Sequence, residues 1–193
     1  SVCAVLLKGG FRTLIVDLRE NGGGGLDSAL PFGECIATDT VDAGYFVTNT
    51  WASKASRPPT AAAFKELLVA QERTTEAFIE TLKTSEGRHL VLYPRSDGFT
   101  GKVYILTSSK TASTCEPIVD ALKRSGRATI VGENTAGAML SAALFQVTGK
   151  YHLFLPIADY FNAELRRLDK VGVAPSIVVP ADEALDHVRK LLE

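Results

Sequence analysis

Short apolar runs alternate along the chain with polar or glycine-rich loops and with segments whose apolar residues recur at helical spacing. Because buried strands give short continuous apolar runs and surface helices give a period near 3.6, the pattern can be divided into elements. We expect strands at residues 2–7, 14–18, 44–48, 89–93 and 103–106, and helices at residues 26–38, 61–83, 116–123 and 181–192. Strands and helices that alternate in this way predict a single α/β domain.

The loop after the predicted strand 103–106 carries the first candidate chemistry. It contains Ser113, Thr114 and Cys115 directly before a helix-like segment with Glu116 in its first turn. A helix N-terminus offers unpaired N–H groups and the positive end of the helix dipole, a setting that suits both a nucleophile and an oxyanion. The alternative is structural, with Ser113 or Thr114 as an ordinary N-cap and Glu116 as its helper.

A second loop follows the predicted strand 14–18, which we expect to be buried on both faces. Four consecutive glycines, 22–25, lead into the predicted helix 26–38, with Asp27 as its expected cap. Strand, glycine turn and helix together present backbone N–H groups to an anion. A flexible turn or a nucleotide site are alternatives, but the run has neither G-x-G-x-x-G nor G-K-[ST], so nucleotide binding has little support.

Together the two loops resemble the catalytic core of the tail-specific, or C-terminal processing, serine proteases. Asp-Leu-Arg-Glu-Asn-Gly-Gly-Gly at 17–24 matches the family's Asp-Leu-Arg-x-Asn-x-Gly-Gly, and Thr-Ala-Ser-Thr-Cys-Glu at 111–116 matches its nucleophile motif. Residues 126–137 match a Gly-Arg-Ala-x-x-Val-Gly-Glu-x-Thr-x-Gly segment. Residues 171–177 are similar to Gly-x-x-Pro-Asp-Ile, with Ser176 in place of aspartate. The resemblance covers residues 12–180 and implies a ClpP/crotonase-like fold of stacked β-β-α units.

By this resemblance Ser113 matches the nucleophile. The backbone N–H of Thr114 and that of one glycine of the 22–25 run, for which we take Gly23, match the oxyanion hole. Two donors from different loops can converge on one carbonyl oxygen while the serine attacks its carbon.

One departure from the family pattern concerns the general base. Bacterial members place a lysine in Thr-x-Gly-Lys, whereas this chain has Thr135-Ala136-Gly137-Ala138. A serine without a base is a poor nucleophile near neutral pH. Lys110 and Lys150 are weaker alternatives within the chain. An alanine at position 138 fits the tricorn-protease branch, whose histidine base lies upstream of the core, and also fits interphotoreceptor retinoid-binding protein, which binds apolar ligands without being a protease.

The histidines and cysteines do not suggest a metal site. His89, His152 and His187 are scattered, so structural or solvated roles are expected, although His152 would matter if it faced the serine. Cys3, Cys35 and Cys115 are widely spaced without C-x-x-C. We expect Cys35 in the core and regard Cys115 as a weaker candidate nucleophile than Ser113.

The composition of the chain excludes several other classes of protein. The chain has 193 residues, 46% hydrophobic residues and a net charge of −1, so it can bury a substantial core. No basic stripe indicates nucleic acid, and no apolar stretch reaches transmembrane length. We expect residues 1–193 to be one protease-core domain, a fragment that lacks the family's upstream helical and PDZ-like regions. The family favours an exported protein, periplasmic or associated with the cell envelope.

The leading interpretation is therefore a serine endopeptidase core that cleaves polypeptides through an acyl-enzyme on Ser113, with a base from outside this chain. No cofactor or metal is required, and a homo-oligomer is left open. The first alternative is a non-catalytic carrier of apolar ligands. Another is a crotonase-fold enzyme that binds a thioester enolate. A groove open on both sides of Ser113 favours the protease, and a closed aliphatic pocket favours the carrier.

Overall fold

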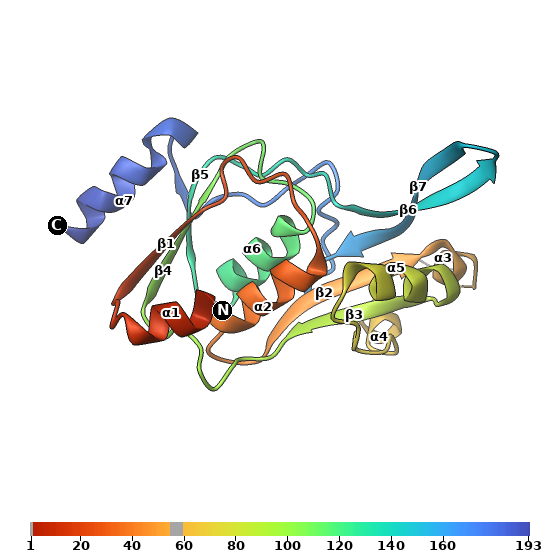
Figure 1. Cartoon of the computed structure of the whole chain (residues 1–193), viewed down its shortest axis with the longest axis horizontal. Helices are drawn as coiled ribbons and strands as arrows, with labels where there is room; N and C mark the ends of the chain where they lie inside the picture. The colour runs from red at the N-terminus through yellow and green to blue at the C-terminus, as the bar shows by residue number, and fades with distance from the viewer. Residues whose placement is uncertain (1, 55–59) are drawn as a thin grey trace.

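A computed structural model describes residues 2–54 and 60–193, and shows two four-stranded sheets with helices between and around them (Figure 1). The strands are β1 (Thr13–Asp17), β2 (Val41–Thr48), β3 (Gly87–Leu92), β4 (Lys102–Thr107), β5 (Thr129–Gly132), β6 (Leu140–Thr148), β7 (Tyr151–Phe161) and β8 (Ile177–Val178). The helices are α1 (Val2–Lys8), α2 (Leu26–Ile36), α3 (Asn49–Lys54), α4 (Ala61–Phe64), α5 (Thr75–Thr84), α6 (Cys115–Arg124), the 3-10 helix η1 (Ala181–Glu183) and α7 (Ala184–Leu192).

The first sheet is parallel, in the order β1-β4-β5-β8, and the second is antiparallel, in the order β3-β2-β7-β6. Helices α2 and α6 lie between the two sheets (Figure 1), and their apolar faces pack into the core together with side chains from strands of both sheets. The buried core includes Leu30, Leu92, Ile105, Ile118 and Val119. The sheets therefore share one core, as expected for an α/β domain.

The expected strands at 44–48, 89–93 and 103–106 and the helices at 116–123 and 181–192 are confirmed, with small shifts of their bounds. The strand at 14–18 exists, but the prediction that it is buried on both faces is wrong. β1 lies at the edge of the parallel sheet, and its residues are half-buried or exposed.

Two other expectations are wrong. Residues 2–7 belong to helix α1 because a short apolar run does not distinguish a buried strand from a helix, and Cys3 and Leu6 on one side of α1 face inward. Residues 61–83 do not form one helix, because Thr74 accepts a hydrogen bond from the Ala77 N–H and starts α5 anew. Between α4 and α5 the chain turns at residues 65–67, and Val69 then forms a β-bridge with His89. The sequence Arg57-Pro58-Pro59-Thr60 also predicts a loop and the start of a helix, but most of it lies outside the described residues.

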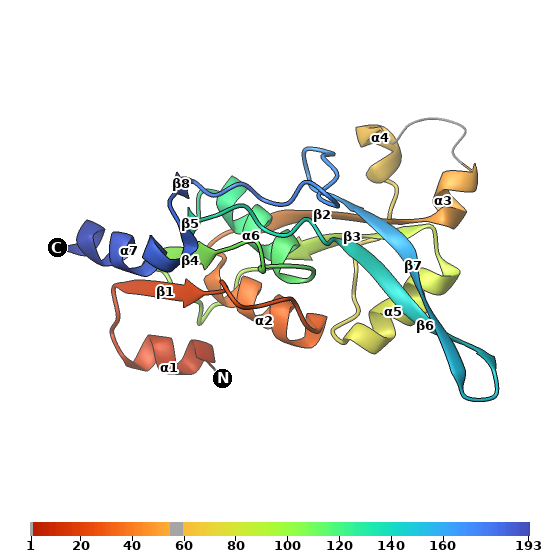
Figure 2. The same ribbon diagram turned by 90° about the horizontal axis from the view of Figure 1, so that it is seen from above.

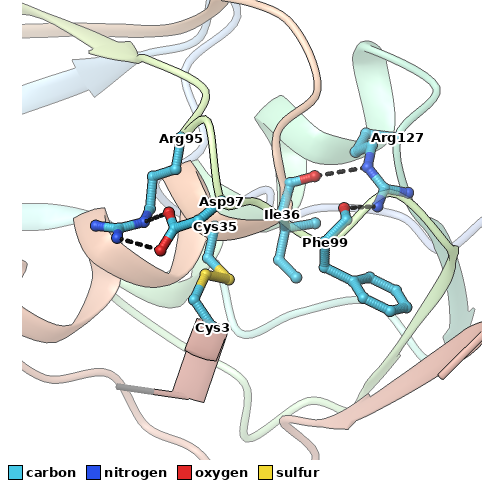
Figure 3. The surroundings of a disulfide bond; sticks show 7 residues. All are labelled: Cys3, Cys35, Ile36, Arg95, Asp97, Phe99 and Arg127. Carbon is cyan, nitrogen blue, oxygen red and sulfur yellow. Dashed lines mark hydrogen bonds and ion pairs between the residues drawn. A yellow bond between two sulfur atoms is a disulfide. The ribbon is translucent and has the colours of Figure 1, made fainter. Parts of the chain in front are cut away.

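Helix α2 is fixed at both ends. The cap expected from Asp27 is not formed; instead the Leu26 N–H donates to Thr75 Oγ1 of α5 at 2.8 Å. At the other end, a disulfide joins Cys3 of α1 to Cys35, and the Arg127 guanidinium donates to the carbonyls of Ile36 and Phe99 (Figure 3). Cys35 is buried as expected, but its pairing was not predicted.

The hairpin formed by β6 and β7 extends away from the body of the molecule, as both ribbon views show (Figure 2). Only the end of β7 nearest the body, Ala158–Phe161, pairs with β2. Within the part of the chain that the structure describes, no helix combines the length and the apolar character needed to cross a bilayer.

Candidate active site

The two loops singled out in the sequence lie side by side. β1 and β4 are parallel neighbours, so the chain leaves both strands at the same edge of the sheet, and each strand is followed by one of the loops. Backbone and side-chain bonds join the loops: the Ala112 N–H donates to the Asn21 carbonyl at 3.2 Å, and Thr111 Oγ1 donates to the Leu18 carbonyl at 2.7 Å. Thr114 Oγ1 also donates to the Gly24 carbonyl at 2.7 Å.

Ser113 has an uncommon backbone conformation directly before Thr114, the N-cap of α6. Its φ of 57° lies in the left-handed region, which costs energy for a residue with a side chain and is common at functional turns. Gly23 lies against it with a φ of 105°. A Cβ at position 23 would come within 2.6 Å of Ser113 Cβ and 3.2 Å of Ser113 Oγ. Close approach of the two loops therefore requires glycine at this position.

A buried carboxylate holds the serine loop in place. Glu116 is fully buried, and its Oε2 accepts hydrogen bonds from the N–H groups of Ser113 and Ala138 at 2.9 and 3.0 Å. Its Oε1 accepts from Thr135 Oγ1 at 2.6 Å and from the Gly137 N–H at 2.8 Å. These four donors satisfy the charge that burial would otherwise leave uncompensated. Glu116 thereby joins the Ser113 loop to the 135–138 segment.

The simple capping alternative is only partly realised. Thr114 is the N-cap of α6, but neither its side chain nor that of Ser113 makes a capping bond. The Glu116 side chain accepts from the N–H of the residue three positions earlier, as in a capping box, but that residue is Ser113 and not the N-cap Thr114.

The two predicted oxyanion donors differ in their surroundings. Among the described residues, no acceptor is bonded to the Thr114 N–H. The Gly23 N–H instead donates to Asn21 Oδ1 at 3.0 Å. This engagement of Gly23 was not predicted, although an asparagine two residues before a glycine is a common sign of such a turn.

Position 138, which corresponds to the lysine of the family's Thr-x-Gly-Lys pattern, lies next to the serine loop, because the Ala138 N–H and the Ser113 N–H share one Glu116 oxygen. The alanine side chain supplies no base. Lys110 is exposed and paired with Glu20 at 2.8 Å, and Lys150 and His152 lie at the outer end of the hairpin. Within the described residues, Ser113 Oγ has no hydrogen-bond partner.

Cys115 is a poor alternative nucleophile. Burial raises the pKa of its thiol, and the nearby Glu116 carboxylate raises it further. Since the thiolate is the reactive form, a raised pKa lowers the reactivity of Cys115 at neutral pH.

The two remaining histidines also lie away from the serine. His89 is paired with Asp42 at 3.0 Å and stacked on Tyr45, and His187 belongs to α7. No group of three or more His, Cys, Asp or Glu that could hold a metal is found among the described residues.

Cavities lie on both sides of the glycine loop. A mainly apolar cavity of about 170 Å³ reaches Ser113, Thr114 and Gly24 and is walled by α5 and the start of β6. A second apolar cavity of about 260 Å³ lies between the loop and α2. On the other side, a wide depression of about 1090 Å³ is lined by charged and polar residues, among them Asp17, Glu20 and Lys110.

A left-handed serine before a helix, set against a glycine turn on a ClpP/crotonase-like α/β fold, indicates the serine hydrolases built on that fold. The family comparison is more specific: residues 2–179 match the model of Peptidase family S41, and the chain belongs to this family. The resemblance inferred from the motifs is thereby confirmed.

Curated relatives are processing proteases. A carboxyl-terminal-processing protease of Synechocystis sp. is 27% identical over 165 residues, which cover 86% of this chain and 30% of that protein. A chloroplastic C-terminal processing peptidase of Tetradesmus obliquus is 27% identical over 182 residues, 92% of this chain and 32% of that protein. The chain thus spans less than a third of these relatives.

Solved structures confirm the fold. The photosystem II D1 C-terminal processing protease superposes with a TM-score of 0.64 at 20% identity, over 93% of this chain and 38% of that one. Mature CPAF superposes with a TM-score of 0.70 at 17% identity, over 99% of this chain and 45% of that one. The preference for the tricorn-like branch stays a prediction.

Proposed function

We propose that this chain is the core of a serine peptidase that cleaves polypeptides through an acyl-enzyme on Ser113, with the general base supplied by a segment outside these residues. The observation that carries the proposal is the contact of Ser113, in a left-handed conformation, with Gly23. The buried Glu116 carboxylate holds this geometry through the Ser113 N–H.

In the proposed reaction, Ser113 Oγ attacks the carbonyl carbon of the scissile peptide bond and gives its proton to the base. The carbonyl oxygen becomes an oxyanion that accepts hydrogen bonds from the Thr114 and Gly23 N–H groups. The C–N bond then breaks, the amine leaves with a proton from the conjugate acid of the base, and water hydrolyses the acyl-enzyme. Asn21 must release the Gly23 N–H when the oxyanion forms, because that N–H is bonded to its side chain.

The cavities favour a peptidase over a carrier of apolar ligands. The two apolar cavities, about 170 and 260 Å³, are below the roughly 300–1,000 Å³ typical of ligand pockets. The first is large enough for one side chain, and the polar depression on the other side of the loop leaves room for an extended chain. The Cys3–Cys35 disulfide supports an exported protein, since disulfides persist in oxidising compartments.

Fluorophosphonate labelling of the full-length protein tests the proposal. We expect one labelled serine, lost in Ser113→Ala and retained in Ser109→Ala, a matched change at an exposed serine of the same loop. Peptidase kcat/KM should fall by several orders of magnitude in Ser113→Ala while the unfolding temperature changes little. Residues 1–193 alone should cleave casein little or not at all. Absence of labelling together with tight binding of an apolar ligand would favour the carrier.

A further inference from the structure

The apolar cavity of about 170 Å³ beside Ser113 is built from segments that the site itself holds in place. One wall comes from Leu26, directly after the glycine run, and another from the first turn of α6. A third comes from residues 139–142, directly after Ala138, whose N–H is bonded to Glu116 at 3.0 Å. Helix α5 contributes a fourth. The cavity therefore has a fixed position relative to the serine.

The lining of this cavity is apolar and uncharged. Among the described residues that border it, none is acidic or basic. Two of its hydroxyl groups are already engaged: Thr75 Oγ1 is bonded to the Leu26 N–H and to Asp27, and Thr114 Oγ1 donates to the Gly24 carbonyl. The fully buried part of the lining consists of Leu26, Phe46, Phe78, Leu90, Ile118 and Met139, with Pro117 beside them. A charged side chain would lose its hydration there without gaining a partner.

The volume of the cavity corresponds to a side chain of intermediate size. One water molecule's share of liquid volume is about 30 Å³, and a methyl or methylene group takes a similar space, so the cavity holds about five or six such groups. A leucine or methionine side chain fits this space. An alanine side chain leaves most of it empty, and the indole of tryptophan is too large.

The cavity also lies close to the atoms that react in the proposed mechanism. It borders Ser113 and Thr114, whose N–H is a proposed oxyanion donor. Ser113 Oγ bonds to the carbonyl carbon of the substrate, and on the acyl side the Cα that carries the side chain is attached directly to that carbon. On the leaving side, the amide nitrogen stands between the carbonyl carbon and the next Cα. The side chain nearest the nucleophile is therefore that of the residue whose carbonyl is attacked.

We infer that this cavity binds the side chain of the residue on the acyl side of the cleaved bond, and that the protein prefers leucine or methionine there. The inference rests on the proposed function, because it takes Ser113 as the nucleophile. A segment from the rest of the protein that filled the cavity would also cover Ser113, which the proposed reaction leaves open to substrate. A side chain of the substrate is therefore the occupant that agrees with the chemistry.

Peptidyl diphenyl phosphonates that differ only in the side chain next to phosphorus test the inference on the full-length protein. Ser113 Oγ attacks the phosphorus, the Oγ–P bond forms, and phenol leaves with the serine's proton, so the rate of labelling reports the acyl-side residue directly. An apolar pocket discriminates a single methylene group by about 10–200-fold. The leucine probe should therefore react at least about tenfold faster than the alanine probe, and about a hundredfold or more faster than lysine and aspartate probes. The tryptophan probe should also react more slowly than the leucine probe.

Two variants at the rim of the cavity should change this preference. Ile79 of α5 and Ala142 of β6 both line the cavity and are half-buried. Ile79→Glu places a carboxylate at the rim and should raise the rate of the lysine probe about tenfold or more. Ala142→Phe fills part of the cavity and should lower the ratio of the leucine rate to the alanine rate about tenfold or more. Ala77→Glu, at an exposed position of the same helix outside the lining, is the matched control and should leave the order of the probes unchanged.

A fluorophosphonate without a peptide part separates the outcomes. If it labels Ser113 but the leucine probe reacts no faster than the alanine probe, the inference is overturned and the proposed function stands. If neither reagent labels Ser113, both are overturned. Equal changes in Ala77→Glu and Ile79→Glu would also overturn the inference, because the added charge and not its place in the cavity would then explain them. Circular dichroism should show that the variants are folded, and Ala142→Phe tests the cavity independently of any loss of folding in Ile79→Glu.

Discussion

At the scale of single residues, the site depends on a carboxylate that is not itself the nucleophile. Glu116 orients the Ser113 N–H and at the same time holds Gly137 and Ala138 through their N–H groups. The serine is therefore fixed by a buried hydrogen-bond network as well as by its own loop. Removing one member of such a network leaves the others buried without partners.

We expect Glu116→Gln to lower the free energy of unfolding by about 3 kcal/mol. Glutamine has an NH₂ group in place of one carboxylate oxygen, and this hydrogen-bond donor would face groups that are themselves donors. Urea unfolding measures the change. Glu20→Gln, which removes an exposed ion pair with Lys110, should cost at most about 1 kcal/mol. Equal effects of the two substitutions would show that the Glu116 network does not stabilise the fold.

Cys115 provides a test of the electrostatics next to the serine. Burial raises its thiol pKa above the ordinary value near 9.0, and Cys115 is the free cysteine because Cys3 and Cys35 are paired. The rate of alkylation by iodoacetamide should therefore rise with a midpoint above pH 9.0 in the folded protein. In urea the midpoint should return to the ordinary value. A folded-state midpoint below pH 9.0 would contradict the inference that burial raises the pKa of the Cys115 thiol, and would restore Cys115 as a candidate nucleophile.

At this scale the sequence motifs predicted that the two loops lie together, while the roles of Ser113, Thr114 and Gly23 stay predictions. Ser113 and the 22–25 loop could be brought together from sequence because both match motifs of one family, and in the structure they follow two neighbouring parallel strands. The bond from the Gly23 N–H to Asn21 could not be predicted with the same certainty, because it depends on the exact path of the turn. The pairing of Cys3 with Cys35 gave no signal in their spacing.

At the scale of elements, α2 connects the glycine loop at its N-terminus to a covalent anchor near its C-terminus. The disulfide closes a loop with a sequence separation of 32 residues and ties α2 to α1. The glycine loop is thus attached to a helix held at both ends, which limits its freedom to move away from Ser113.

Loss of this disulfide should destabilise the protein without removing the site. From the entropy of closing a loop of this length, we expect Cys3→Ser with Cys35→Ser to lower the free energy of unfolding by about 3–4 kcal/mol. The control is Cys115→Ser, which removes a thiol and no cross-link. In the wild type, the free energy of unfolding measured with and without reducing agent should differ by the same amount. A double variant as stable as the wild type would show that the disulfide does not hold α2.

Most element boundaries were predicted to within a few residues, but the assignments of residues 2–7 and 61–83 were wrong. The apolar run at 2–7 was assigned to a strand because its helical spacing is too short to recognise, and α1 was missed. The expected helix at 61–83 has apolar residues at helical spacing, but the Thr74 cap and the bridge of Val69 with His89 divide it. Tertiary contacts that decide such cases are not visible in a local pattern.

At the scale of the whole molecule, contacts between residues far apart in the sequence hold the base of the hairpin against β2 within the antiparallel sheet. Tyr160 of β7 is fully buried, packs against Phe46 and donates its hydroxyl hydrogen to the Ala43 carbonyl of β2. Asp120 of α6 is close enough to add its negative charge to the effect of burial. The hydroxyl therefore has to remain neutral while the domain is folded.

This requirement predicts loss of stability at high pH. Burial raises the pKa of Tyr160 well above its ordinary value of 10.0, so the folded protein keeps a proton that the unfolded chain releases. The contribution of this neutral tyrosine to the free energy of unfolding is fully present below about pH 10. It decreases as the pH rises above that value, because the unfolded state then binds fewer protons than the folded state. Urea unfolding of the wild type between pH 7 and pH 11 should show this decline in the free energy of unfolding.

The variant Tyr160→Phe tests the cause. It should be less stable than the wild type by about 1 kcal/mol at pH 7, because it loses the hydrogen bond to Ala43, and its free energy of unfolding should decline less above pH 10. Tyr93→Phe, at an exposed tyrosine, should follow the wild-type curve, and parallel curves for Tyr160→Phe and the wild type would exclude Tyr160 as the cause.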